Sequence, residues 1–231
     1  MGPIMSGRSS RTGRSSNSKT RGSVQPLVLG IDLAGSPKRN TGVCLMRGRR
    51  IVEWGTLFSD EEIARFVART TPHLIAIDAP LNLPPGRKTL DDRNGEHFRP
   101  CDRELMRRGI RFFPITLGPM RTLTERGIFL KEYFSRKGYR VIEMYPGAAQ
   151  DVWETGRKQD GLPRLRRGLE GLGIKGLDKK MNGDELDAAT GALVGYWFLK
   201  GKAEVLGNFD EGAIVVPLPA GKKSTTTGSS S

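Results

Sequence analysis

The chain has 231 residues and carries 38 Lys and Arg against 25 Asp and Glu, a formal net charge of +13 at pH 7. This length fits one domain of ordinary size. Its two cysteines, Cys44 and Cys101, are too few for a disulfide framework and lack metal-site spacing. No apolar run approaches the roughly 20 residues of a membrane helix, and no apolar segment follows the first basic residues. We therefore expect a cytoplasmic protein with reduced thiols, no secretory signal and no membrane partner.

Much of the positive charge lies near the two ends of the chain. Residues 1–25 carry five Lys and Arg and no acid, and residues 218–231 carry two Lys, so residues 26–217 keep a net charge of +6. Both end segments are rich in Ser and Gly, and we expect them to be disordered tails around a single domain. A basic domain fits a polyanionic partner such as nucleic acid, although the same charge also serves solubility.

The predicted elements begin with three strand-like segments joined by short turns, which favour antiparallel pairing. A capping box, with Ser59 as N-cap and Glu62 three residues later, then opens a helix that Pro72 ends. A fourth strand follows, and the irregular stretch after it, residues 79–122, is long enough to indicate a functional loop. The predicted strands are residues 26–33, 41–47, 50–57, 74–78 and 139–144, and the predicted helices are 59–70, 100–108, 122–137 and 183–199.

The order of these elements, β-β-β-α-β-α-β-α, is that of a ribonuclease H-like fold. We expect an α/β domain whose mixed five-stranded sheet has its first three strands antiparallel and its later strands parallel. In that fold the first and fourth strands are neighbours at the centre of the sheet. A last apolar run, residues 213–216, is either an edge strand or a docked tail.

Carboxylates fall at the ends of these elements. Asp32 and Asp78 end the first and fourth predicted strands, while Asp184 and Asp187 lie three residues apart on one face of the last predicted helix. Unpaired buried charge is costly, and crowded carboxylates raise one another's pKa values, so a divalent cation among them is expected. Oxygen ligands suit Mg²⁺ or Mn²⁺. Glu143, at the end of the fifth strand, is either a further ligand or a salt-bridge partner, and Asp184 is either a ligand or a helix cap.

Such a cluster predicts phosphodiester chemistry, because two divalent ions about 4 Å apart activate a water and stabilise the leaving oxygen. Ligands bind beyond the C-terminal ends of strands in open α/β sheets, where these acids are expected to lie. We interpret the chain as a Mg²⁺- or Mn²⁺-dependent nuclease with Asp32, Asp78 and Asp187 as catalytic residues. The candidate metal ligands are Asp32, Asp78, Asp184, Asp187 and Glu143.

A basic segment in the long loop and the helix after it predicts a substrate contact. Arg99 and Arg103 can grip a phosphate, with Asp102 orienting one of them, or can instead form a salt bridge at the helix start. Arg87 and Lys88 add positive charge to the same region, and all five residues are candidates for substrate binding.

Five segments along the chain carry a family resemblance: Gly30-Ile31-Asp32-Leu33-Ala34-Gly35, Ile77-Asp78-Ala79-Pro80-Leu81-Asn82-Leu83-Pro84, Arg99-Pro100-Cys101-Asp102-Arg103-Glu104, Glu143-Met144-Tyr145-Pro146-Gly147 and Asp184-Glu185-Leu186-Asp187-Ala188. Taken in order, they resemble the predicted ribonuclease H-like nucleases grouped as domain of unknown function 429. They span the chain from about residue 27 to 200. The resemblance implies the ribonuclease H-like fold and a metal site at Asp32, Asp78 and Asp187, with Asp184 added. The pair on the last helix is also similar to that of Holliday-junction resolvases of the RuvC type, which usually carry Glu rather than Asp on the fourth strand.

Two other functions remain open from the residues alone. One is a nucleic-acid-binding protein without catalysis. The other is a nucleotide-binding phosphotransferase with an actin-like fold, because residues 30–35 followed by Thr41-Gly42 resemble its first phosphate loop. No second Gly-rich loop follows near Asp78, which counts against the phosphotransferase.

Overall fold

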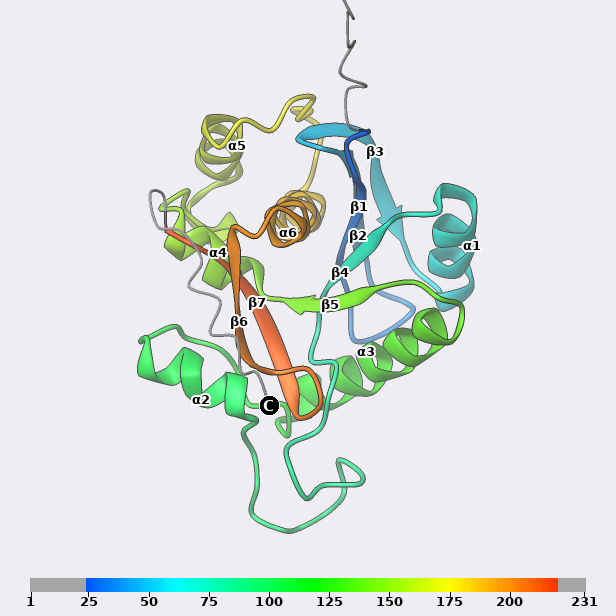
Figure 1. Ribbon diagram of the computed structural model, residues 1–231, viewed down its shortest axis with the longest axis vertical. Coiled ribbons are helices and arrows are strands. Elements are labelled where there is room, and N and C mark those ends of the chain that lie inside the picture. Colours follow the sequence, from blue (N-terminus) through cyan, green and yellow to red (C-terminus); the bar gives the residue numbers. More distant parts are fainter. Residues whose placement is uncertain (1–23, 220–231) are drawn as a thin grey trace, which may run out of the picture.

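A computed structural model describes residues 24–219 of the chain. The tails expected at residues 1–25 and 218–231 lie almost entirely outside these described residues. Within them, one mixed sheet carries helices on both faces (Figure 1). None of the helices in residues 24–219 combines the length and apolar character that a membrane crossing requires.

The sheet has seven strands in the order β3-β2-β1-β4-β5-β7-β6. β1 pairs antiparallel with β2 and parallel with β4, and β5 continues the parallel series. This arrangement confirms the ribonuclease H-like class, with the first and fourth strands as central neighbours. The bounds are β1 Leu27–Asp32, β2 Thr41–Arg47, β3 Arg50–Leu57, β4 Leu74–Asp78, β5 Val141–Met144, β6 Ala203–Asn208 and β7 Gly212–Pro217.

The predicted count of five strands is wrong, because the end of the domain adds a hairpin. β7 pairs parallel with β5 and antiparallel with β6. The apolar run at residues 213–216 is therefore neither an edge strand nor a docked tail; it lies inside the sheet, buried along its whole length. The edge belongs to β6, which is only partly buried and so carries little apolar signal.

Helices cover the two faces of the sheet in separate groups (Figure 1). α1 and α3 pack on the face formed by alternate residues of β1, β2 and β4, while α4, α5 and α6 pack on the opposite face. α2 lies against β6 and β7. The bounds are α1 Asp60–Thr70, α2 Pro100–Arg107, α3 Gly118–Arg136, α4 Pro146–Val152, the 3₁₀ turn η1 Lys158–Asp160, α5 Leu162–Gly171 and α6 Gly183–Leu199.

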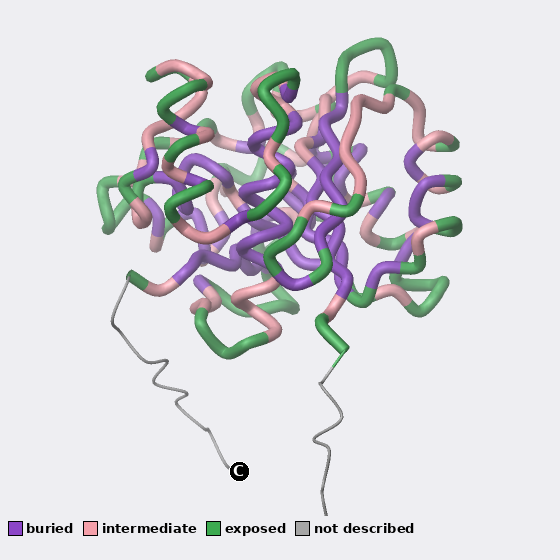
Figure 2. The backbone as a smooth tube through the Cα atoms, turned by 90° about the horizontal axis from the view of Figure 1, so that it is seen from above, coloured by how far each residue is buried: buried purple, intermediate pink, exposed green. Residues whose placement is uncertain are grey.

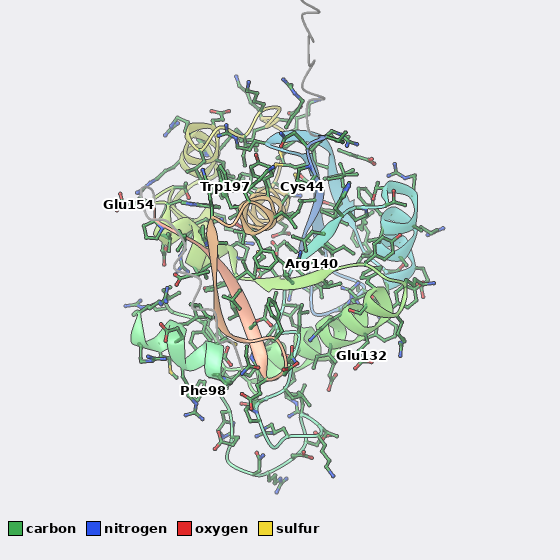
Figure 3. The ribbon with its side chains drawn as sticks, viewed as in Figure 1. Cys44, Phe98, Glu132, Arg140, Glu154 and Trp197 are labelled. Carbon is green, nitrogen blue, oxygen red and sulfur yellow. The ribbon has the colours of Figure 1, made fainter. Side chains whose placement is uncertain are left out.

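Burial follows from this layering. The central strands are buried on both faces, as expected for strands with helices on either side, and Figure 2 shows buried segments through the middle with exposed turns outside. Cys44 and Cys101 are free and buried, as predicted for core thiols. Cys44 lies beside α6 (Figure 3). Burial raises the pKa of both thiols, which keeps them protonated.

Two glycines allow α6 to lie almost in contact with the backbone of the sheet. A Cβ added at Gly30 would come within 1.9 Å of the Ala188 carbonyl oxygen, and one at Gly42 within 2.3 Å of the Asp184 backbone. No other residue fits at that distance without moving the helix. The start of α6 is therefore held directly over the ends of β1 and β2.

Candidate functional site

Two of the predicted acids are partners in the central strand pair. Asp32 and Asp78 are opposite one another in the parallel β1–β4 register, at the C-terminal end of each strand. Parallel neighbours lie about 5 Å apart, so the register places the two carboxylates side by side. The Asp32 side chain is only 14% exposed. This part of the predicted site follows from the strand pairing alone.

The other two acids come from the first two turns of α6. Asn182 is the N-cap and accepts a hydrogen bond from the Glu185 N–H at 2.9 Å, while a Glu185 carboxylate oxygen accepts from the Asn182 N–H at 2.8 Å. The cap is thus Asn182, and Asp184 is not needed for that role. Asp184 and Asp187 instead face the end of β1, where one lysine contacts them both together with Asp32.

That lysine, Lys158 in η1, is the functional residue that the sequence analysis missed. Its Nζ lies 3.4 Å from Asp32 Oδ2, 3.0 Å from Asp184 Oδ1 and 2.9 Å from Asp187 Oδ2. An ammonium group therefore lies where the three carboxylates meet. No local pattern identifies Lys158, because its contact with Asp32 spans 126 residues.

Gln150 in α4 is a second residue that the sequence did not identify. Its amide nitrogen donates to Asp187 Oδ1 at 2.6 Å and to Thr190 Oγ1 at 3.2 Å, and all three groups are buried. The hydrogen bond fixes one oxygen of Asp187 while the other faces Lys158. Gln150 thus sets the orientation of the Asp187 carboxylate.

Crowding and burial shift the acid–base behaviour of this centre. Burial, followed by the charge of Asp187 and then that of Asp184, raises the pKa of Asp32 to about 7, although Lys158 acts in the opposite direction. Burial and the neighbouring Asp32 and Asp187 raise the pKa of Asp78 well above its ordinary value. Burial also raises the pKa of Asp187, with Lys158 opposing it. The centre carries more negative charge than one lysine can balance.

The donor set fits a hard divalent cation. Four carboxylates supply only oxygen atoms, the ligands that Mg²⁺ and Mn²⁺ prefer. Within residues 24–219, however, no three His, Cys, Asp or Glu side chains are already arranged around one ion-sized position. The oxygens of Asp184 and Asp187 that face Lys158 lie about 3 Å from its ammonium nitrogen, which is roughly 1 Å farther than from a Mg²⁺ ion to its ligands. Lys158 holds the carboxylates at ammonium spacing.

Glu143 does not join this centre. Its carboxylate accepts from Arg99 at 2.7 and 2.8 Å and from the Leu81 backbone N–H at 2.8 Å. Burial raises the pKa of Glu143, and the Arg99 guanidinium partly offsets this. Of the two expectations for Glu143, metal ligand or salt-bridge partner, the structure places it in the salt bridge.

Arg99 and Asp102 belong to the same buried network rather than to an exposed phosphate grip. Arg99 is 1% exposed and donates to Asp102 at 2.8 and 3.0 Å as well as to Glu143. Its guanidinium pairs with two carboxylates and its side chain is only 2% exposed, so it does not form an exposed phosphate site. The network instead ties the start of α2 to β5.

The remaining candidates for substrate binding lie in α2 and in the loop between β4 and α2. This loop extends beyond the sheet in Figure 1. Arg87 donates to backbone carbonyl oxygens of its own loop, which organises that loop. Lys88 is exposed. Arg103 is exposed too and pairs with Glu96 at 2.8 Å. The structure brings none of the three to the acidic centre.

A cavity of about 160 Å³ borders the acidic centre at Asp78. Its walls are mostly apolar, with Phe112, Met120 and Leu123 among them, and Tyr145 also lines it. The Tyr145 hydroxyl donates to the Arg111 carbonyl oxygen at 2.8 Å. One side of Asp78 therefore faces apolar space, and burial there accounts for its raised pKa.

Comparisons with known proteins agree with part of the sequence resemblance. A family model described as protein of unknown function (DUF429) matches residues 30–122. The resemblance to this family is confirmed over those residues. The match includes the segments at Asp32, Asp78 and Arg99 and ends before α6. A comparison with curated proteins finds no match.

Two solved structures are similar to this chain at low identity. "T. thermophilus RuvC in complex with Holliday junction substrate" has 12% identity and a TM-score of 0.47, and covers 76% of this chain and 96% of its own. "Thermus thermophilus RuvC structure" has 14% identity and a TM-score of 0.40, with the same coverage. The fold class of this chain follows from its own strand order and pairing.

Proposed function

We propose that the chain is a divalent-metal-dependent nuclease that hydrolyses phosphodiester bonds in nucleic acid. The observation that carries this proposal is the gathering of four carboxylates at one point of the sheet, at the C-terminal ends of two adjacent central strands. Asp32 and Asp78 come from the paired strands, and Asp184 and Asp187 come from α6 above them. Ligand sites of open α/β sheets lie at such strand ends.

The proposed cofactor is Mg²⁺ or Mn²⁺, held by these four aspartates. When bound, the metal would supply an activated water and stabilise the leaving oxygen. The chain itself does the positioning: the β1–β4 register fixes Asp32 against Asp78, and the amide of Gln150 fixes one oxygen of Asp187. Glu143 is not proposed as a ligand, because Arg99 binds it.

Nucleic acid is the proposed partner because the domain is basic outside its acidic centre. Residues 26–217 carry a net charge of +6 despite the four clustered acids. Exposed basic residues such as Lys88 and Arg103 supply sequence-independent attraction to phosphates. A cytoplasmic location is proposed from the two buried free thiols.

The test is a cleavage assay on labelled single-stranded, duplex and branched DNA and RNA, with Mg²⁺, Mn²⁺ or EDTA. We expect metal-dependent cleavage of at least one substrate, lost in Asp32→Asn and Asp78→Asn. The matched control is Glu132→Gln, which removes one exposed negative charge on α3 (Figure 3) and should leave cleavage unchanged. Equal cleavage in EDTA or in the two aspartate variants would refute the proposed mechanism.

The same assay separates the two alternative functions. Salt-sensitive binding without cleavage in any metal would identify a nucleic-acid-binding protein. Metal-dependent hydrolysis of ATP with no action on nucleic acid would identify a phosphotransferase instead.

A further inference from the structure

We propose that Lys158 is the resident cation of the acidic centre and that it must withdraw before a divalent metal binds. This inference rests on the proposed function, since it concerns the same four carboxylates. It makes Lys158 a positioning residue that competes with the metal rather than a ligand that helps to hold it.

The geometry of the ammonium carries the first step. Nζ of Lys158 lies 2.9–3.4 Å from oxygens of Asp32, Asp184 and Asp187. A Mg²⁺ ion bound to the same oxygens needs them at about 2.0–2.1 Å, so it would occupy the space of the ammonium. The two cations are also of like charge. The centre therefore holds one of them at a time.

The surroundings of Lys158 allow its side chain to move while its backbone stays in place. The preceding residue, Arg157, is anchored by a two-point ion pair with Asp151, with N–O distances of 2.5 and 2.9 Å. The Lys158 stem crosses the first residue of α6, where a Cβ added at Gly183 would lie 3.1 Å from its Cδ. The side chain is 34% exposed. Four rotatable bonds let it turn to the solvent side without unfolding η1.

The contacts of Lys158 also balance part of the negative charge of the centre. Four crowded carboxylates repel one another, and one ammonium in contact with three of them reduces that repulsion. The carboxylates are thus kept close and oriented, at a spacing slightly too wide for the ion. A divalent metal held by the same carboxylates would supply two positive charges where Lys158 supplies one.

The test measures Mn²⁺ affinity directly, by the loss of the free-ion electron paramagnetic resonance signal, without any nucleic acid. We expect Lys158→Met to bind Mn²⁺ about tenfold more tightly than the wild type, because a competing unit charge is gone. Lys158→Gln should behave the same way, and Lys158→Arg, which keeps the charge, should not gain affinity. The matched control is Lys180→Met, because Lys180 is exposed and lies outside the centre. The Mn²⁺ affinity of this variant should stay within about twofold of the wild-type affinity.

The outcomes separate this inference from the proposed function. Wild-type binding of Mn²⁺ with equal or weaker binding by both Lys158→Met and Lys158→Gln would overturn the role of Lys158 and leave the metal site standing. Binding by none of the proteins would overturn both. Circular dichroism on each variant verifies that the compared proteins are folded.

Discussion

The acidic centre should make the metal-free protein less stable as the pH rises, and Asp32→Asn should remove much of this effect. Burial and the charge of Asp187 raise the pKa of Asp32 from its ordinary 3.8 to about 7. Between these two values the folded chain keeps a proton that the unfolded chain has released. Stability is therefore lost as the pH rises through this window, and the full loss is present above pH 7.

The magnitude follows from the size of the pKa change. About 3 pH units at about 1.36 kcal/mol each give a cost of up to about 4 kcal/mol at pH 8. The Asp32 side chain is only 14% exposed, so solvent screening reduces this value little. An asparagine at this position carries no charge, and the variant should be more stable than the wild type at pH 8. The gain corresponds to roughly 8–16 °C in Tm for a domain of this size.

The assay is thermal or urea unfolding in EDTA at several pH values between 4 and 8. We expect the stability difference between Asp32→Asn and the wild type to be near zero at pH 4 and to grow toward pH 8. Asp210→Asn is the control, because its side chain is exposed and lies outside the acidic centre, so its effect on stability should change little with pH. Two results would refute this reasoning: Asp32→Asn is less stable than the wild type at pH 8, or the stability difference between them does not change with pH. Either would show that the folded protein does not disfavour the charged form of Asp32.

Three further predictions concern positions that shape the fold and the site. Arg99→Ala should destabilise the protein by about 3–5 kcal/mol in urea unfolding, because it leaves two buried carboxylates without their cation. Arg103 is exposed, so Arg103→Ala should cost less than about 1 kcal/mol. Equal costs for the two variants would contradict the buried network. Gly30→Ala should cost about 3 kcal/mol or more, because its Cβ would meet the α6 backbone, whereas Gly55→Ala has open space and should change stability by less than about 1 kcal/mol. Gln150→Ala should cost about 1–3 kcal/mol through the lost buried hydrogen bonds, and wild-type stability of this variant would contradict its contact with the α6 acid.

The sheet was predictable where apolar runs are long and end in a clear signal. β1 to β5 and α1, α2, α3 and α6 lie close to their predicted ranges. Most of these strands are apolar runs buried on both faces, and α1 and α6 open with capping boxes, so the local patterns are strong. β6 was not predicted, because it is a partly exposed edge strand that only its pairing with β7 identifies. α4 and α5 were not predicted, because α4 has only seven residues and α5 contains Pro163, Gly168 and Gly171, which have low helix propensity.

The site was predictable to the extent that strand ends define it. Asp32, Asp78 and the α6 pair follow from the topology, because the register of adjacent parallel strands brings their ends together. Lys158 reaches the centre from a connection without regular pattern, and only the tertiary fold shows the contact. Arg99 could not be separated by sequence from a phosphate-binding arginine, since burial alone decides between the two roles.

The placement of the acids along the chain also dictates when the centre comes into existence. Its members extend from residue 32 in β1 to residue 187 in α6. α6 packs against β1, although nearly the whole domain separates the two elements in sequence. Contacts between segments so distant in sequence add a loop-closure cost, and chains rich in such contacts fold slowly. Until α6 docks, Asp32 and Asp78 remain hydrated carboxylates with no partner helix above them. A nascent or truncated chain that stops short of α6 therefore lacks the four-carboxylate centre, which exists only in a molecule whose folding is complete.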